Sequence, residues 1–362
     1  MFILGLDIGG ANTKAALLKF KGNKFIDGMS VIEYFPFWEK THKDIGAMFD
    51  TLVQKLASNF SISPDQIDYI AISITAELSD AFYTKREGIF IILTALKETF
   101  GEERLKFVNT HNQFVDYFLA KKDYFAISAA NWVGTALFVG NFVENCILID
   151  GGSTTIDIIP IINKFPNTQG KDDTTRIINH ELIYTGALRA TIPSITHFVP
   201  FRGNNVRISF EKFALISDVH RILNNITDDE YITDTADHRS ISLEDCYARL
   251  ARMICSDLDL ISKKELTEIA EFIYEKQLEL ISSEIELFME SLVKRFPELE
   301  HNPQFIVTGL CAEFLIKKAL YTLNYTNILD FKQVTGVPNN VSSSAFAVAG
   351  ALYHNHLKKM KE

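Results

Sequence analysis

Cysteine and positive charge are scarce in the 362-residue sequence, and each shortage excludes a class of protein. The four cysteines form no CxxC pair, so we expect buried thiols rather than a zinc knuckle or a disulfide framework. Lysine and arginine together number 36 against 46 aspartates and glutamates, a net charge of -10 that repels a polyanionic backbone. Nucleic acid is therefore not an expected partner.

Long apolar runs and a leader-like N-terminus are also missing from the sequence. No uninterrupted apolar stretch reaches the roughly 20 residues that span a bilayer. Met1 leads straight into a strand-like segment, without a basic region or a small-residue cleavage site. We therefore expect a cytoplasmic protein with no membrane partner. The hydrophobic content of 47% is enough for one large or two medium domains with their own cores.

The first half of the sequence alternates between strand and helix patterns. Its opening segments are apolar and joined by glycine-containing turns, which indicates three successive strands. Later segments repeat apolar residues every three to four positions, which is typical of helices packed on a core. The order predicts a mixed α/β domain. We expect strands at 2–8, 13–20, 25–35, 67–74 and 105–109, and helices at 42–60, at 88–100 and from His111.

The second half begins with the same pattern as the first. An apolar run, an aspartate, two glycines, small polar residues and another apolar run occur at Asp7 and again at Asp150. This repetition predicts two related domains that face one another across a cleft. We place them at 1–145 and 146–362, with a lid-like insertion at 163–262 and a long amphipathic helix at 264–296.

The two glycine turns have the composition of phosphate-binding loops. We call residues 7–14 loop 1 and residues 150–155 loop 2. Glycine exposes backbone N–H groups, and hydroxyls, an amide and the Lys14 ammonium add further donors for phosphate oxygens. Asp7 and Asp150 cannot favourably touch a phosphate, but they can hold Mg²⁺ or its waters. The expected phosphate-binding residues are Gly9, Gly10, Asn12, Thr13, Lys14, Gly151, Gly152, Ser153, Thr154 and Thr155.

A simpler interpretation of both turns stays open. Glycine is ordinary in hairpin turns because it permits positive φ, and each aspartate could merely cap its own turn. Lys14 could then point into solvent. The presence of two such loops, and of a third glycine turn after a strand at Gly309, favours phosphate binding.

Longer motifs carry a family resemblance. Loops 1 and 2 and the segment VTGLCAEFL at 307–315 resemble the two phosphate loops and the adenosine-side loop of the actin, sugar kinase and heat-shock ATPase superfamily. Other segments resemble the hydantoinase/oxoprolinase-related proteins, and among these the archaeal methanofuran-pathway synthases. These segments are ITAELSDAF (74–82), KREGI (85–89), AANW (129–132), ELIYTGALRA (181–190), EKFALISDVHRIL (211–223), TADHRSIS (235–242) and RLARMI (249–254).

The resemblance implies both a fold and a reaction. The fold is an α/β arrangement of two actin-like, ribonuclease H-like domains around a central cleft. The reaction is a transfer in methanofuran biosynthesis, in which 5-(aminomethyl)-3-furanmethanol diphosphate condenses with γ-glutamyltyramine. The phenol oxygen displaces diphosphate and forms an aryl-alkyl ether. Mg²⁺ is then the expected cofactor, and ATP is not expected.

Such a reaction needs specific side chains, and the sequence offers candidates for each. Cations must neutralise the leaving diphosphate, and a phenol with a pKa near 10 needs a base. An aromatic wall would stabilise positive character on the furylmethyl carbon. Lys14 is the candidate for the charge of diphosphate, and Arg189 or Arg176 could meet diphosphate or the γ-glutamyl carboxylates. The other candidates are Glu77 or Asp80 as base, Trp132 and Gly309 in the substrate pocket, and Asp7 and Asp150 for the metal.

Competing interpretations accompany these assignments. Glu77 could cap a helix, Asp80 could pair with Lys85 or Arg86, and Trp132 could be an ordinary core indole. At the level of function, the loops alone would suit an ATP-dependent kinase or ATPase, or a non-catalytic nucleotide-binding protein. Cys311 speaks against ATP, because it replaces a usual glycine and would crowd a purine. His220 and His238 lack metal-ligand spacing and are expected in the core or at the surface. A homodimer is an open alternative to a monomer.

Overall fold

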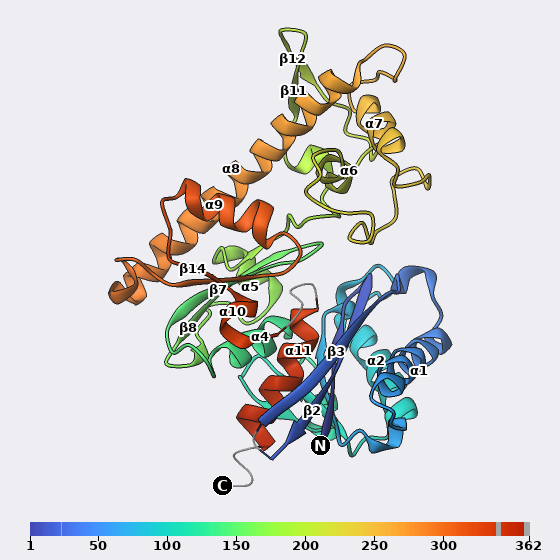
Figure 1. Ribbon diagram of the computed structural model, residues 1–362, viewed down its shortest axis with the longest axis vertical. Coiled ribbons are helices and arrows are strands. Elements are labelled where there is room, and N and C mark those ends of the chain that lie inside the picture. The colour runs from blue at the N-terminus through green and yellow to red at the C-terminus, as the bar shows by residue number, and fades with distance from the viewer. Residues whose placement is uncertain (23, 338–341, 358–362) are drawn as a thin grey trace. The chain divides into compact units, whose positions relative to one another are not determined.

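The protein, seen in a computed structural model, is described at residues 1–22, 24–337 and 342–357 (Figure 1). Its internal contacts divide it into two compact units. Unit 1 comprises Met1–Leu148, Ile159–Arg176 and Asp330–Glu362, and unit 2 comprises Ile149–Ile158 and Ile177–Leu329. The domain boundaries and the insertion expected from the sequence stay predictions. Among the described helices, none is long and apolar enough to cross a membrane.

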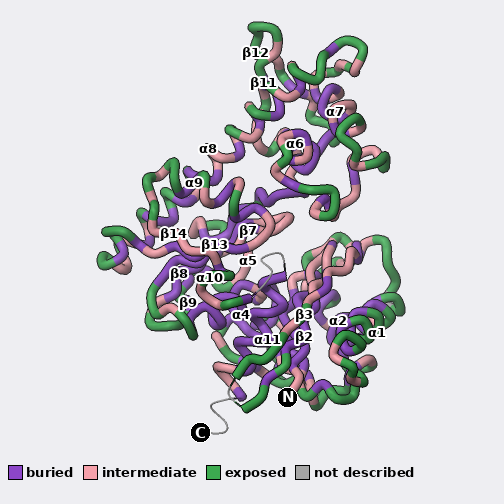
Figure 2. Tube along the Cα trace, in the orientation of Figure 1, coloured by how far each residue is buried: buried purple, intermediate pink, exposed green. Residues whose placement is uncertain are grey.

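Unit 1 is built on a mixed six-stranded sheet. The first three strands are antiparallel neighbours, and β4 and β5 continue the sheet in parallel with β1. Strand β1 is almost entirely buried, whereas the edge strand β3 is largely exposed (Figure 2). The sheet order is β3 (Lys24–Tyr34), β2 (Asn12–Lys21), β1 (Phe2–Ile8), β4 (Tyr69–Ile74), β5 (Leu105–Val108) and β6 (Phe114–Val115).

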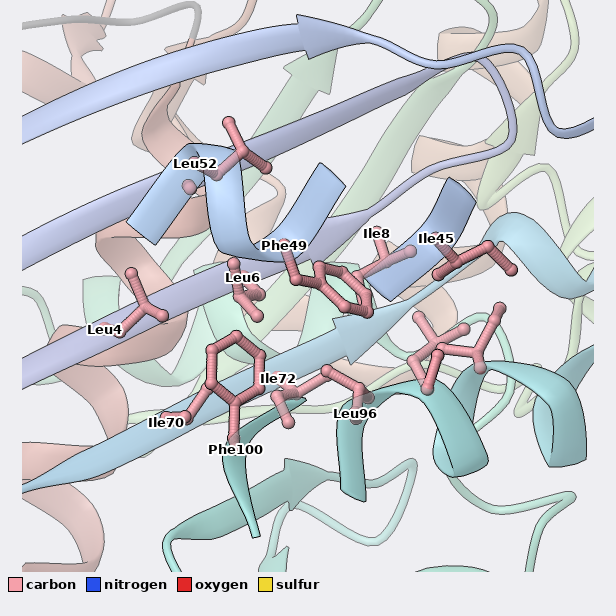
Figure 3. Packing of buried hydrophobic residues seen from close by; sticks show 14 of the residues in the cluster. Leu4, Leu6, Ile8, Ile45, Phe49, Leu52, Ile70, Ile72, Leu96 and Phe100 are labelled. Atoms are coloured by element: carbon pink, nitrogen blue, oxygen red, sulfur yellow. The ribbon is translucent and has the colours of Figure 1, made fainter. Parts of the chain in front are cut away.

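Alternation along β1 assigns its side chains to two different layers. Leu4, Leu6 and Ile8 point into a hydrophobic cluster with α1 (His42–Asn59) and α2 (Lys85–Phe100) (Figure 3). Gly5 and Asp7 therefore belong to the opposite face, where α11 (Ser343–Ala351) packs together with α4 (Asn131–Val139). A Cβ at Gly5 would lie 2.0 Å from the Ala345 carbonyl oxygen, so glycine permits this close approach.

One helix of unit 1 starts later than the sequence predicts. The helix expected from His111 is instead α3 (Tyr117–Lys122), because Asp116 caps its first turn by accepting a bond from the Leu119 N–H at 2.9 Å. The preceding residues form a tight turn, in which Asn112 has a φ of 63°. The short helices of this unit's first part are η1 (Phe37–Glu39), η2 (Pro64–Gln66) and η3 (Ala76–Leu78).

The second sheet has the order β10 (Leu182–Ile183), β8 (Ile156–Ile162), β7 (Cys146–Gly151), β13 (Phe305–Thr308) and β14 (Ile328–Asp330), with β9 (Phe165–Pro166) paired to β8.

In unit 2 the predicted long helix is α8 (Lys263–Arg295), which starts at a Ser262–Glu265 capping box. Near one end of α8 lie β11 (Phe198–Phe201), β12 (Asn204–Arg207), α6 (Ile216–Ile222) and α7 (Leu243–Arg252) (Figure 1). The remaining elements are α5 (Asp173–Ile178), η4 (Ile192–Ser194), η5 (Pro297–Leu299), η6 (Ala312–Ile316), α9 (Lys317–Thr322), α10 (Phe331–Thr335) and η7 (Leu352–Leu357).

Three of the motifs that carry the family resemblance meet in a buried ion-pair network in unit 2. The Arg249 guanidinium lies 2.7 Å from Asp218 Oδ1 and 3.1 Å from Asp237 Oδ1, and both Arg249 and Asp218 are fully buried. Tyr231 donates to Asp218 at 2.8 Å, and Arg252 pairs with Asp237 at 2.8 Å. A network with this many internal partners holds α6, α7 and the intervening loop together, so these motifs are structural.

The histidines and cysteines largely follow expectation. His220 is fully buried, and His238 is exposed. All four cysteines are free thiols, as predicted, but the expectation that all are buried is wrong for Cys255. Cys255 is exposed because it follows the end of α7 in a surface turn with a φ of 55°.

Candidate active site

Three neighbouring strands of unit 1 place a row of polar side chains on the face covered by α11. Lys14 on β2 and Ser73 on β4 lie directly opposite Asp7 on β1. Ser73 Oγ donates to Asp7 Oδ1 at 3.0 Å, and Lys14 Nζ lies 3.7 Å from Asp7 Oδ2. Lys14 therefore faces Asp7 rather than open solvent, and Asp7 does more than cap its own turn.

Helix α11 completes this row with a residue from the far end of the chain. Ser344 Oγ donates to Asp7 Oδ2 at 2.6 Å and accepts a bond from Lys14 Nζ at 3.4 Å. The Asp7 side chain is 8% exposed, so its polar neighbours are two hydroxyls and an ammonium rather than bulk water. Lys14 keeps 28% of its side chain exposed and can still meet an anion.

The turn of loop 1 lies against the segment that follows β4. Gly9 N–H donates to the Asn12 carbonyl at 3.1 Å, and a Cβ at Gly10 would meet Ser79 Cβ at 3.3 Å. Within the described residues, the buried atoms Asn12 Oδ1, Thr13 Oγ1 and Ser79 Oγ have no hydrogen-bond partner. Unpartnered buried polar atoms are rare in folded proteins, so this turn has unused capacity to bind a ligand or water.

Glu77 occupies η3 and is 1% exposed. Ser128 Oγ donates to its Oε1 at 2.6 Å, while Oε2 has no hydrogen-bond partner in the described part of the chain. Burial raises the pKa of Glu77 to about 7, although the bond from Ser128 opposes the shift. Glu77 does not cap α2, because Thr84 fills that position.

Asp80 does not form the ion pair with Lys85 that was its alternative role, and Trp132 is buried against an arginine. Asp80 is exposed, and the nearby Lys85 pairs with Asp173 at 2.9 Å instead. Trp132 is 2% exposed, and the buried Arg176 guanidinium lies 4.6 Å from its ring centroid. That face of the indole is therefore already occupied by a cation. The role of Trp132 as a wall for the furan stays a prediction.

Loop 2 in unit 2 has every one of its carbonyl oxygens from 151 to 155 engaged. The Thr155 carbonyl accepts from Gly152 N–H at 2.9 Å within the loop. The others accept from two flanking segments, which we call wall A (residues 185–189) and wall B (residues 309–316). Gly186, Ala187, Leu188 and Arg189 of wall A donate to the carbonyls of residues 154, 152, 153 and 153, and Cys311 of wall B donates to that of residue 151.

Glycines let both walls approach loop 2. A Cβ at Gly186 would lie 2.6 Å from the Gly152 carbonyl oxygen, and one at Gly309 would lie 2.3 Å from that of Gly151. Gly309 also has a φ of 92°, which strains any other residue. Carbonyl oxygens repel an anion, so a loop whose carbonyls are bonded to its walls or within the loop is suited to phosphate.

Three residues singled out from the sequence lie in or beside loop 2: Asp150 at its start, Arg189 in wall A and Cys311 in wall B. A Cβ at Gly309 would come 2.6 Å from Asp150 Oδ1, so Asp150 borders wall B. Arg189 is half-buried, and its N–H donates to the Ser153 carbonyl at 3.2 Å. Cys311 is fully buried with its Sγ 3.9 Å from the Gly152 carbonyl oxygen, so its thiol packs under loop 2. Across the described ranges, no three His, Cys, Asp or Glu side chains gather to hold a metal ion.

Sequence reasoning missed several residues of these two sites. Ser73, Ser128 and Ser344 donate to the carboxylates that it did single out. The run of three serines at 342–344, just before a small-residue helix, was the only local signal for Ser344. No signal along the chain pointed to the contacts between loop 2 and wall A.

Comparison with solved structures identifies the class of fold. The chain resembles acetone carboxylase in its nucleotide-free structure, with a TM-score of 0.53 and 11% identity over 96% of this chain and 70% of that one. The mixed α/β fold is of the actin-like ATPase type, as the sequence predicts.

The chain belongs to the hydantoinase/oxoprolinase family, whose model matches residues 68–356. It is 35% identical to a (4-{4-[2-(gamma-L-glutamylamino)ethyl]phenoxymethyl}furan-2-yl)methanamine synthase of Methanocaldococcus jannaschii, over 97% of this chain and 98% of that protein. A protein of the same name from Methanococcus vannielii is 33% identical, over 58% of this chain and 91% of its own length.

Proposed function

We propose that this chain is a transferase that joins γ-glutamyltyramine to 5-(aminomethyl)-3-furanmethanol diphosphate and releases diphosphate. The observation that carries the proposal is the full-length similarity to a synthase whose product name contains a phenoxymethyl-furan ether. Disconnecting that ether at its aryl oxygen gives a γ-glutamylated tyramine and an activated furylmethyl group. The reaction forms one C–O bond to the phenol, breaks one C–O bond to diphosphate and transfers the phenol proton to a base.

The geometry of loop 2 supports the proposal that diphosphate is the leaving group. The carbonyls of residues 151–154 are bonded to walls A and B, and the Gly152 N–H is bonded to the Thr155 carbonyl within the loop. The hydroxyls of the loop are therefore the proposed donors to the departing oxygens. Arg189, which is anchored beside Ser153, is the proposed bidentate partner for diphosphate. In unit 1, Lys14 offers a partly exposed ammonium whose position is fixed by Asp7 and Ser344.

Mg²⁺ is part of this proposal, with Asp7 and Asp150 as the carboxylates that would hold it or its waters. Mg²⁺ is commonly bound by one or two carboxylates together with substrate phosphates and water, so the absence of a three-residue cluster within the described ranges fits such a site. When bound, the ion would neutralise charge on the phosphate oxygens.

Glu77 is the proposed base for the phenol. A base with a pKa near the working pH transfers protons best, and burial brings Glu77 to about 7. The free Oε2 leaves one oxygen to accept the proton. Asp80 is more exposed but lacks this environment.

The test is incubation of the protein with Mg²⁺, the furan diphosphate and γ-glutamyltyramine, followed by mass spectrometry. We expect the coupled ether and one diphosphate per ether. Lys14→Ala should lower kcat about a hundredfold, because it removes charge stabilisation at the leaving group. Lys19→Ala, at an exposed position of the same strand, is the matched control and should keep normal turnover. No ether from folded wild-type protein would contradict the proposal.

A further inference from the structure

Helix α8 contacts both walls of loop 2 through two side chains. Gln277 Nε2 donates to Thr185 Oγ1 at 3.0 Å and to the Gly186 carbonyl at 3.2 Å, both in wall A. Tyr274 OH donates to the Phe314 carbonyl in wall B at 2.5 Å. Residues three apart lie on the same face of a helix, so one face of α8 holds both walls.

The bonds made by Gln277 are buried, whereas the Tyr274 bond is partly buried. Gln277 is fully buried, and so is His220, whose ring lies 4.8 Å from that of Phe314 and 6.0 Å from that of Tyr274. Burial lowers the pKa of His220 to about 3, so the imidazole is neutral. Without the Gln277 amide, the Gly186 carbonyl would lose a partner in a place that water does not reach, which is costly.

The conformation of loop 2 therefore depends on α8 indirectly, through walls A and B. Walls A and B fix the loop's carbonyls, and Gln277 and Tyr274 fix the walls. The same helix also packs against β11, α6 and α7, and the Asp218–Arg249 ion pair joins α6 to α7. A shift of α8 along its axis would move both walls together.

We propose that Gln277 and Tyr274 are positioning residues that hold loop 2 in the shape that binds the diphosphate group. The proposal rests on the proposed function for the identity of the substrate. It assigns control of diphosphate affinity to a helix that bonds to both walls of the loop.

The test compares Gln277→Met and Tyr274→Phe with the wild-type chain. Calorimetry with inorganic diphosphate and Mg²⁺ should show about tenfold weaker binding for Gln277→Met and about fivefold for Tyr274→Phe, from the loss of two hydrogen bonds and one. The KM for the furan diphosphate should rise in parallel, while the KM for γ-glutamyltyramine stays constant. Ser282→Ala is the matched control, because this buried α8 hydroxyl has no hydrogen-bond partner in the described ranges.

Diphosphate affinities within twofold of wild type in both variants would overturn the proposal, as would an equal rise in both KM values. If Gln277→Met fails to fold, Tyr274→Phe decides, since it loses a single hydroxyl. A wild-type chain that binds diphosphate but forms no ether contradicts the proposed function alone, because the calorimetric comparison needs no turnover. A wild-type chain that binds no diphosphate overturns both.

Discussion

Asp7 and Glu77 are two buried carboxylates of unit 1 with opposite surroundings. Asp7 accepts bonds from Ser73 and Ser344, and the Lys14 ammonium lies 3.7 Å from its Oδ2. Glu77 has one hydroxyl donor, and burial raises its pKa to about 7. Glu77 is thus suited to take up and release a proton near neutral pH.

Replacing Glu77 by glutamine should stabilise the protein above neutral pH. The folded pKa of about 7 exceeds the ordinary 4.5, so the folded state binds more protons than the unfolded chain between these values. The free energy of unfolding therefore falls as pH rises through that window, by on the order of 3 kcal/mol at completion. Thermal unfolding should show Glu77→Gln with a higher Tm than wild type at pH 8 and a similar Tm at pH 5.

Glu98→Gln, at an exposed position on α2, is the control and should leave the pH dependence of Tm unchanged. If Glu77→Gln follows the wild-type Tm at every pH, Glu77 does not carry the buried proton that the structure indicates. The same variant should lose ether formation if Glu77 is the base.

At the scale of elements, loop 2 is shaped by its walls as much as by its own sequence. Wall A approaches through Gly186 and wall B through Gly309, and each approach leaves no room for a Cβ. The glycines inside loop 2 were evident from the sequence, whereas Gly186 and Gly309 lie outside the loop and permit its walls to approach. The loop and its walls are thus joined by hydrogen bonds and close backbone contacts.

Gly309→Ala should disrupt these contacts. The alanine Cβ would lie 2.3 Å from the Gly151 carbonyl oxygen, so the loop must move. The alanine would also have to adopt a φ of 92°. We expect a loss of roughly 3 kcal/mol or more in the free energy of unfolding and loss of diphosphate binding by calorimetry. Gly203→Ala is the control, because its φ is 76° with nothing within 4 Å, and it should cost only about 1 kcal/mol. Equal effects of the two substitutions would show that backbone strain alone matters.

The elements themselves were largely predictable, and their partners were not. The strands at 2–8 and 67–74 and the long helix near 264–296 follow from periodicity, which depends on neighbours in sequence. The helix expected from His111 was wrong because a local turn and the Asp116 cap decided its start. Ser344 and Gln277 were missed because their contacts span 337 and 92 residues, and a single sequence holds no signal for such pairing.

At the scale of the whole molecule, the net charge and the proposed diphosphate ligand have the same sign. The chain carries a charge of -10, so an anionic substrate must be bound by local donors and cations rather than by the overall field. Lys14, Arg189 and loop 2 provide such local features. This arrangement favours a compact, metal-neutralised anion over a free polyanion.

Inorganic diphosphate with Mg²⁺ should therefore raise the Tm of the whole protein. A ligand present at about 100 times its Kd stabilises the folded state by about 2.7 kcal/mol, which corresponds to roughly 3–8 °C. ATP with Mg²⁺ should shift the Tm little, and a chelator should abolish the diphosphate shift. Sulfate at equal ionic strength is the control. A larger shift with ATP than with diphosphate would favour a nucleotide-dependent enzyme instead.

The bond between Ser344 and Asp7 also bears on how the protein is made. Loop 1 is translated well before Ser344, whose hydroxyl bonds to Asp7 and follows it by 337 residues in the sequence. A nascent chain can therefore form the sheet of unit 1 while loop 1 is still incomplete. Maturation of this site must wait for the C-terminal helix, so a chain truncated before α11 would fold in part and remain inactive.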